Sequence, residues 1–350
     1  MSGAPNLSVI GYGMWTAAGH DGPSSVAAMR AGVSGASRAN LWDYTSGENL
    51  MAFRVNAHQW WEGPTFLPEL ILPVVQECRD QVPEILGVAP EDIPILLGVA
   101  PDGRPGRDAN LEHSLREGLA EKMGGALPAR SELIAQGRVS LPYLLQRAAS
   151  LGGPAIIVGV ESFLRQSIVE HYIKKSRLLC GANSSGFIAG EAAAGLLVAP
   201  SGQSGGPELR ITGMGKGLEP SGDGGSKDQP VSAKGLTEAL RAAEQMSGRQ
   251  FYDIPLVMAD LNGEHFKFKE LALASIRVDR LPPEGGSRRP RDHVEHWNVV
   301  ETIGEVGAAL LPAAMGWAFE AGRSGFLPGA VMFAAGEDDG TRVALVGEMA

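Results

Sequence analysis

Cysteine and histidine, which most often serve as nucleophile, base or metal ligand, are scarce in this 350-residue sequence, with 2 Cys and 7 His. The two cysteines, Cys78 and Cys180, lie far apart, which argues against a disulfide framework or a structural zinc site and favours a reducing, cytoplasmic compartment. His293 and His296 have the spacing of two metal ligands on one helix face, but no third ligand follows nearby. We therefore interpret them as part of a solvated polar segment and predict no metal site.

One serine has a position that could suit a nucleophile. Ser140 directly precedes an expected helix, where backbone N–H groups could activate a hydroxyl. No histidine stands close to it in sequence, and serine at a helix start most often serves as an N-cap. We interpret Ser140 as the cap of the helix that follows.

Two glycine patterns follow apolar runs and could suggest a dinucleotide site. They are Gly11 with Gly13, and Gly213 with Gly215 and Gly217. Neither completes the G-x-G-x-x-G pattern with a helix beginning on time, and no Walker A sequence occurs. We interpret both as tight turns and predict no cofactor.

Any site would have to be positioned by strands and helices that alternate along the chain. Continuous apolar runs at residues 7–12, 95–99 and 154–160 are typical of strands buried on both faces. A stretch at 33–63 has no clear pattern. Helices are expected at 24–30, 67–86, 111–123, 141–151 and 163–172.

The alternation of apolar strands and helices begins again after a Gly-, Pro- and Ser-rich linker at 200–207. The apolar run at 210–215 repeats that at 8–13, the segment 253–258 repeats 92–97, and a helix at 237–243 repeats the one at 24–30. A helix at 307–319 and a strand at 330–333 repeat the pair at 141–151 and 154–160. An internal duplication follows, with halves at 1–204 and 205–350, each of alternating α and β elements.

Composition limits the classes of partner. The formal net charge is −10 with a pI of about 5.3, which argues against nonspecific binding of nucleic acid or of anionic membranes. No apolar stretch reaches the roughly 20 residues of a membrane helix, and no signal peptide is apparent at the start. We expect a soluble, cytoplasmic protein.

A stretch at 185–198 is the most telling motif. Its Gly186, Phe187, Gly190 and Glu191 resemble the D-G-F-x-x-G-E-G-A motif of the β-ketoacyl synthase branch of the thiolase superfamily. The opening 9–19 is similar to V-x-G-x-G-x-x-T-P-x-G, and Gly304 and Gly307 fall within a segment similar to T-x-G-x-x-G-A. The resemblance implies an α/β fold of five layers, αβαβα, built from two pseudo-symmetric halves.

The catalytic residues of that family are missing at the matching positions. A synthase needs a cysteine at the start of a buried helix, whereas the corresponding loop here holds Gln136, Gly137 and Arg138. Asp260 matches the first catalytic histidine, and Glu301 matches the second when 300–304 is aligned with G-H-T-x-G. The C-terminal G-F-G-G-x-N loop is replaced by 336–340, of which Gly336 remains. We therefore predict no acyl condensation.

The resemblance also implies that several carboxylates converge on one cavity. Asp260, Glu264, Glu301 and the acidic run 337–339 could bind a divalent cation or form an acid–base pair. The alternative is a former active site whose carboxylates are solvated or paired with Arg138 and His296. We favour the alternative, since loss of an activity is commoner than its replacement.

The resulting hypothesis is a catalytically inactive synthase homologue that acts as a binding, assembly or accessory protein. The family implies a homodimer, or a heterodimer with a related subunit, formed through the N-terminal half. Acyl carrier protein is a further candidate partner, through basic segments at 174–177 or 288–291. The segment 260–264 resembles accessory proteins of type VI secretion effectors. The alternatives are an acyltransferase with an altered site and, because of Gln136, a subunit like a chain length factor.

Overall fold

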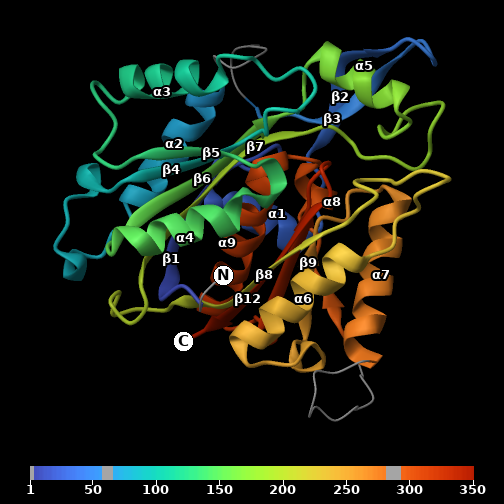
Figure 1. Ribbon diagram of the computed structural model, residues 1–350. Helices are drawn as coiled ribbons and strands as arrows, with labels where there is room; N and C mark the ends of the chain where they lie inside the picture. Colours follow the sequence, from blue (N-terminus) through green and yellow to red (C-terminus); the bar gives the residue numbers. More distant parts are fainter. Residues whose placement is uncertain (1–3, 57–65, 281–292) are drawn as a thin grey trace.

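The computed structural model describes residues 4–56, 66–280 and 293–350. Within these ranges, strands and helices alternate along the chain (Figure 1). The N-terminal elements are β1 (Leu7–Trp15), α1 (Gly22–Ala31), β2 (Ala36–Asp43), β3 (Glu48–Phe53), α2 (Leu67–Arg79), β4 (Ile95–Val99), α3 (Leu111–Lys122), β5 (Glu132–Ala135), α4 (Ser140–Leu151), β6 (Ala155–Ser162), α5 (Gln166–Lys174) and β7 (Glu191–Pro200). The C-terminal elements are β8 (Leu209–Leu218), α6 (Lys234–Ser247), β9 (Leu256–Ala259), α7 (His265–Arg280), β10 (Glu295–His296), α8 (Val300–Ile303), α9 (Leu310–Arg323), β11 (Val331–Gly336) and β12 (Thr341–Met349).

The main sheet consists of two runs of five strands with the same internal order. One run is β5-β4-β6-β7-β1 and the other is β10-β9-β11-β12-β8. In both runs the first three strands are parallel and the last two join antiparallel. A short pairing of β1 with β8, at Ser8↔Arg210 and Val9↔Leu209, connects them. The predicted α/β fold of two pseudo-symmetric halves is confirmed; the boundary at residue 205 stays a prediction.

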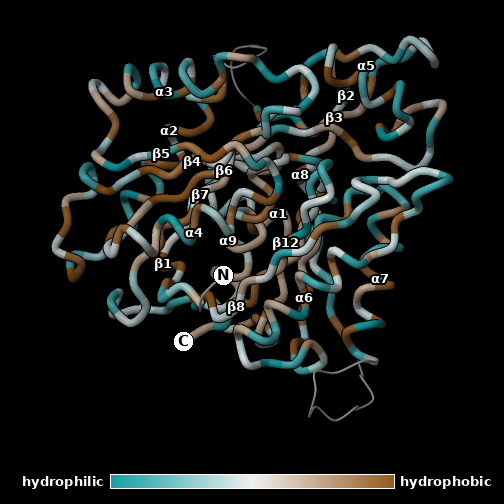
Figure 2. The backbone as a smooth tube through the Cα atoms, in the orientation of Figure 1, coloured by the Kyte–Doolittle hydropathy of each residue, from teal (hydrophilic) through white to brown (hydrophobic). Residues whose placement is uncertain are grey.

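Helices cover both faces of each run and give five layers (Figure 1). α4 and α9 lie in the middle, in one buried cluster with the inner faces of both runs. α2 and α3 cover the outer face of the first run, and α6 and α7 cover the outer face of the second. Figure 2 shows β4, β6 and β7 as largely hydrophobic, as expected of strands covered on both sides. The central helices therefore begin deep inside the molecule.

The glycines of β8 show why these layers lie so close. A Cβ at Gly215 would lie 1.8 Å from the Ala239 carbonyl oxygen of α6, and one at Gly217 would lie 2.0 Å from that of Gly235. In β1, a Cβ at Gly13 would lie 2.8 Å from the Val74 carbonyl oxygen of α2. The prediction of tight turns at these glycines is wrong: they lie within strands and let a helix backbone rest on the sheet.

The same contacts correct one of the predicted repeats. The helix at 237–243 is α6, which packs on β8 and β12, and its counterpart on β1 and β7 is α2. α1 packs instead against β1 and the central α9. The predicted position of α1 is correct. Asp21 and Ser24 form a capping box at its start, and Gly32, with a φ of 65°, ends it. Its pairing with α6 was wrong.

Several elements escaped the sequence patterns. The stretch 33–63 contains the hairpin β2–β3, and the expected helix 67–86 ends at Arg79, with a separate 3₁₀ turn at Glu84–Leu86. α7 and β12 were not predicted. Among the described residues, no helix has the length and apolar character needed to span a membrane.

Candidate functional site

The loop between β5 and α4 directs a buried arginine into the interior of the protein, at the start of α4. Gly137 has a φ of 53°, and the following Arg138 is 2% exposed. The Arg138 backbone N–H donates to Glu337 Oε2 at 2.9 Å. Its guanidinium also forms ion pairs with four carboxylates: Glu305 (3.3 Å), Glu337 (3.2 Å), Asp223 (3.2 Å) and Asp338 (2.5 Å).

Two further arginines reach the same carboxylates from other elements. Arg104, in the loop after β4, pairs with Glu161 at 2.7 Å and with Glu337 and Asp338 at 3.0 Å each. Arg177, after α5, pairs with Glu264 at 2.6 Å and with Asp338 at 3.0 Å. Asp338 thus lies between three guanidinium groups.

Two cations from the C-terminal half complete the assembly. Lys267 of α7 pairs with Asp260 at 2.5 Å, and Arg342 of β12 pairs with Glu270 at 2.8 Å and with Asp223 at 2.9 Å. We call the whole group the ion cluster. Its members are Arg104, Arg138, Arg177, Lys267 and Arg342 with Glu161, Asp223, Asp260, Glu264, Glu270, Glu305, Glu337 and Asp338.

Burial and the neighbouring cations act in opposite directions on the acidic members. Burial raises the pKa of Glu161 and of Glu270 above its usual value, although Arg104 and Arg342 counteract it. For Glu305 and Asp338, burial is again the largest single effect, but the lowering effects together outweigh it and the pKa is lowered. For Asp338 these are three arginines; for Glu305 they are Arg138, Lys267 and the hydrogen bond from Asn262. The ion cluster therefore depends on its arginines to remain charged inside the protein.

Three of the glycines that the resemblance singled out allow the chain to approach these charges. A Cβ at Gly137 would lie 2.2 Å from Glu337 Oε2, one at Gly307 would lie 1.9 Å from Glu161 Oε2, and one at Gly336 would lie 2.7 Å from Arg342 Cδ. Gly137 and Gly307 also have positive φ. A side chain at any of them would displace a member of the ion cluster.

The structure brings together most of the acidic residues that the sequence proposed. Asp260, Glu264, Glu337 and Asp338 belong to the ion cluster. Glu301 does not: it is exposed and accepts a hydrogen bond from Asn298 Nδ2 at 3.3 Å. Asp339 is also exposed.

The sequence analysis missed Glu305, which is fully buried between Arg138 and Asn262. The G-H-T-x-G motif had been aligned with 300–304, where no glycine takes its first position. Shifted to Gly304, the motif has its leading glycine and places Glu305 on the histidine. That glycine was the signal that could have found the residue.

Ser140 does not cap α4. The N-cap residue is Val139, Ser140 is the first residue of the helix, and no side chain caps its N-terminus. The Ser140 hydroxyl is buried without a hydrogen-bond partner among the described residues. The prediction of an N-cap is wrong, because the 3₁₀ turn at Gly137–Val139 already leads the chain into the helix.

The motif at 185–198 has a structural place beside the ion cluster. Phe187 packs edge-on against Phe163 and Tyr172, with ring centroids 5.8 and 5.0 Å apart. A Cβ at Gly186 or Gly190 would meet backbone atoms within 2.7 Å. Glu191 is buried and accepts hydrogen bonds from the Ser162 hydroxyl (2.9 Å) and the Val55 N–H (3.3 Å).

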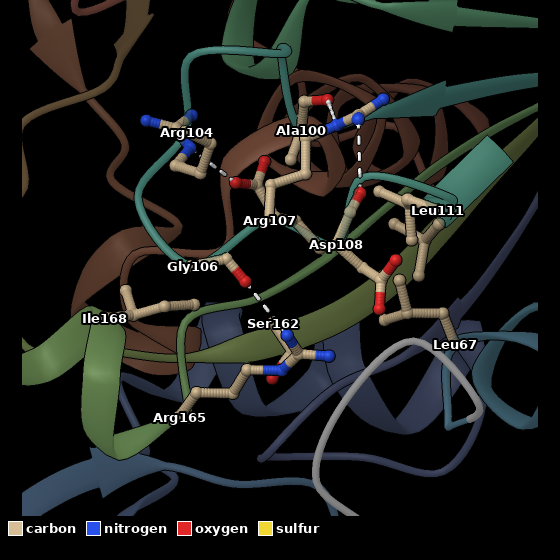
Figure 3. A pocket seen from close by; sticks show the side chains of 12 residues that line it. Leu67, Ala100, Arg104, Gly106, Arg107, Asp108, Leu111, Ser162, Arg165 and Ile168 are labelled. Atoms are coloured by element: carbon tan, nitrogen blue, oxygen red, sulfur yellow. Dashed lines mark hydrogen bonds and ion pairs between the residues drawn. The ribbon is translucent and has the colours of Figure 1, made fainter.

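A pocket that is partly open to solvent adjoins the ion cluster and is lined by residues between Leu67 and Ile168 (Figure 3). Arg104 and Glu161 line it from the ion cluster. Arg107 and Arg165 also line it, and both are tied to backbone carbonyls, Arg107 to Ala100 at 3.0 Å and Arg165 to Gly106 at 2.9 Å. No thiol lines the pocket.

The two thiols lie elsewhere. Cys78 is fully buried in α2, where burial raises the pKa of its thiol far above the usual value, and Cys180 is half-buried. In the part of the chain that the structure describes, no group of three or more His, Cys, Asp or Glu side chains could hold a metal ion. The carboxylates of the ion cluster are instead paired with cations, which is the arrangement that the sequence analysis favoured for them.

The basic surface predicted at residues 174–177 is only partly present. Lys174 and Lys175 are exposed at the end of α5, but Arg177 is turned into the ion cluster. The basic segment 174–177 is therefore smaller than predicted. The second segment, 288–291, lies outside the described residues.

No family model matches the sequence, and no curated protein matches it. Solved structures do match over the whole chain. One is described as the ishigamide ketosynthase/chain length factor, with a TM-score of 0.74, 15% identity and 98% of each chain covered. A ketosynthase in complex with its chain length factor from Xenorhabdus doucetiae gives 0.71 and 14%, again with 98% of each chain covered. A type II acyl-carrier protein in complex with its ketosynthase gives 0.74 and 11% at the same coverage. This chain therefore has the thiolase-like fold of ketosynthases and chain length factors.

Proposed function

We propose that this protein is a non-catalytic subunit of thiolase-like fold that acts by binding a protein partner. The observation that carries the proposal is Arg138, fully buried at the start of the central helix α4 and paired with four carboxylates. A synthase would place its thiolate at this point. Here a permanently charged group fills the position.

The chemistry of the ion cluster supports this reading. A condensing site needs a nucleophile and hydrogen-bond donors directed at a developing oxyanion. Asp260 and Glu305, which match the two histidines, are acceptors when ionised, and both are engaged, Asp260 with Lys267 and Glu305 with Arg138. Neither carboxylate can therefore donate a hydrogen bond to an oxyanion, as a histidine would.

The edge strand β5 is the best place for a partner. It pairs only with β4 in the described part of the chain, and all four of its residues are half-buried. An unpaired strand edge readily accepts another strand, so a homodimer or a heterodimer with a related subunit would continue the sheet there. Gln136 directly follows β5, and the structures similar to this one include complexes of a ketosynthase with its chain length factor. A subunit that pairs in this way with an active ketosynthase is our second candidate.

The link to type VI secretion effectors rests on the segment 260–264 alone. In the structure this segment serves the ion cluster, since Asp260 pairs with Lys267 and Asn262 Nδ2 donates to Glu305 at 2.7 Å. The identity of the partner is thus a question for purification from the native host.

Affinity purification of the tagged chain, followed by mass spectrometry, tests the proposal. We expect one protein in stoichiometric amount, either a ketosynthase relative or an unrelated client, and its loss in Leu133→Lys, which places a charge on β5. Leu72→Lys, at a position of α2 that is partly buried against the same core cluster as Leu133, is the matched control. A monomer that retains no partner, or equal retention by both variants, would contradict the assignment to β5.

A further inference from the structure

A second depression lies away from the ion cluster, between α1, α8, α9 and the segment after β10. It is open to solvent and is lined by aromatic and charged side chains. The residues that matter here are Arg30, Trp297, Asn298, Glu301, Trp317 and Phe326. Glu301 is the residue that the sequence analysis had placed in the other site.

The apolar wall of the depression is a stack of rings. Trp297 lies on Trp317 with ring centroids 4.9 Å apart and planes at 24°, and Phe326 follows at 6.2 Å from Trp297. Trp297 is held in place by its indole N–H, which donates to Glu295 Oε2 at 3.0 Å. Trp317 is 7% exposed, and its buried indole N–H has no hydrogen-bond partner among the described residues.

Two opposite charges stand at the same depression without ion-pair partners in the described chain. The Arg30 guanidinium lies over the Phe326 ring, 4.2 Å from its centroid, so its N–H groups remain able to donate. The Glu301 carboxylate accepts only the hydrogen bond from Asn298. Both side chains are exposed.

From these observations we propose that the depression binds a small zwitterion with an aromatic or apolar body, of the class of free aromatic amino acids. The ammonium group pairs with Glu301 on α8. The carboxylate pairs with Arg30, and the body covers the tryptophan stack. This inference is independent of the proposed function and of the ion cluster.

The stacked tryptophans provide the measurement. Titration with L-phenylalanine, which absorbs little where tryptophan is excited, should produce a saturable change in fluorescence, and Trp297→Phe should reduce its amplitude. Each charge contributes a charge-assisted hydrogen bond, so N-acetyl-L-phenylalanine and L-phenylalaninamide, which lack one charge each, should bind about tenfold more weakly.

Two variants assign the charges. Glu301→Gln should weaken L-phenylalanine and its amide alike and leave the N-acetyl compound unchanged. Arg30→Met should weaken L-phenylalanine and the N-acetyl compound and leave the amide unchanged. Glu238→Gln and Arg116→Met, at exposed positions on other helices, are the matched controls. No saturable change up to the solubility of L-phenylalanine, or equal affinity for the three compounds, would overturn the proposal.

Discussion

At the scale of single residues, Arg138 decides what the ion cluster is. Its guanidinium compensates three buried carboxylates and the half-buried carboxylate of Asp338, so Arg138→Met should leave uncompensated charge inside the protein. The expected loss in the free energy of unfolding is about 3–5 kcal/mol. Arg147→Met is the control, because its pair with Glu132 is on the surface and its loss should have little effect. Urea unfolding of both variants makes the comparison; equal stability would show that the ion cluster does not depend on Arg138.

Glu191 gives a residue-level prediction on pH. Burial, opposed by the hydrogen bond from Ser162 and the charge of Arg54, raises the pKa of Glu191 to about 7, from a usual value of 4.5. The folded protein therefore binds this proton more tightly than the unfolded chain, so stability is lost as the pH rises through about 7. The loss from this group is on the order of 3 kcal/mol.

Glu191→Gln tests this directly, since the amide cannot ionise. The free energy of unfolding, measured from about pH 5 to about pH 8, should fall less steeply in the variant than in the parent protein. Glu48→Gln, at an exposed position, should keep the parent slope. If Glu191→Gln also keeps it, Glu191 is ionised throughout this range in the folded state.

At the scale of elements, the close approach of α6 to β8 depends on glycine. Gly215→Ala would place a methyl group 1.8 Å from a backbone oxygen, which forces the helix away from the sheet. We expect a loss of about 1–3 kcal/mol, as for an overpacked core. Gly153→Ala is the control, because nothing lies within 4 Å of its added methyl group. Thermal unfolding should separate the two; a Gly215→Ala variant as stable as the control would contradict the packing.

The helices and strands also show which parts of the fold could be predicted from the sequence. Apolar runs such as Ile95–Val99 and capped helices such as α1 were predictable, because their signals are local. The glycines of β8 were mistaken for turns, since glycine marks a turn and a close helix contact alike. Asp260 could be found from its place beside a strand end, whereas Glu305 could be found only by shifting the motif alignment by four residues. The pairing of Arg138 with Asp223 joins distant segments and has no signal in either.

At the scale of the whole molecule, two similar halves meet at the central helices α4 and α9. The loops that begin these helices carry Arg138 and Gly307, so the ion cluster lies where both halves contribute. By the resemblance to ketosynthases, we infer that a synthase would hold its reacting groups at this place. The fold is retained here around a set of charges that compensate one another.

The most direct test of this account is a search for a covalent acyl intermediate. The purified protein, alone and with its partner, would be incubated with acyl and malonyl thioesters, and intact-protein mass spectrometry would follow its mass while thioester decarboxylation is measured. We predict an unchanged mass and no decarboxylation above the level without protein, both for the native chain and for Arg138→Met. An acyl adduct on the native chain, or turnover that is lost in Asp260→Ala while Glu48→Ala retains it, would contradict the central claim that the ion cluster has replaced a catalytic site.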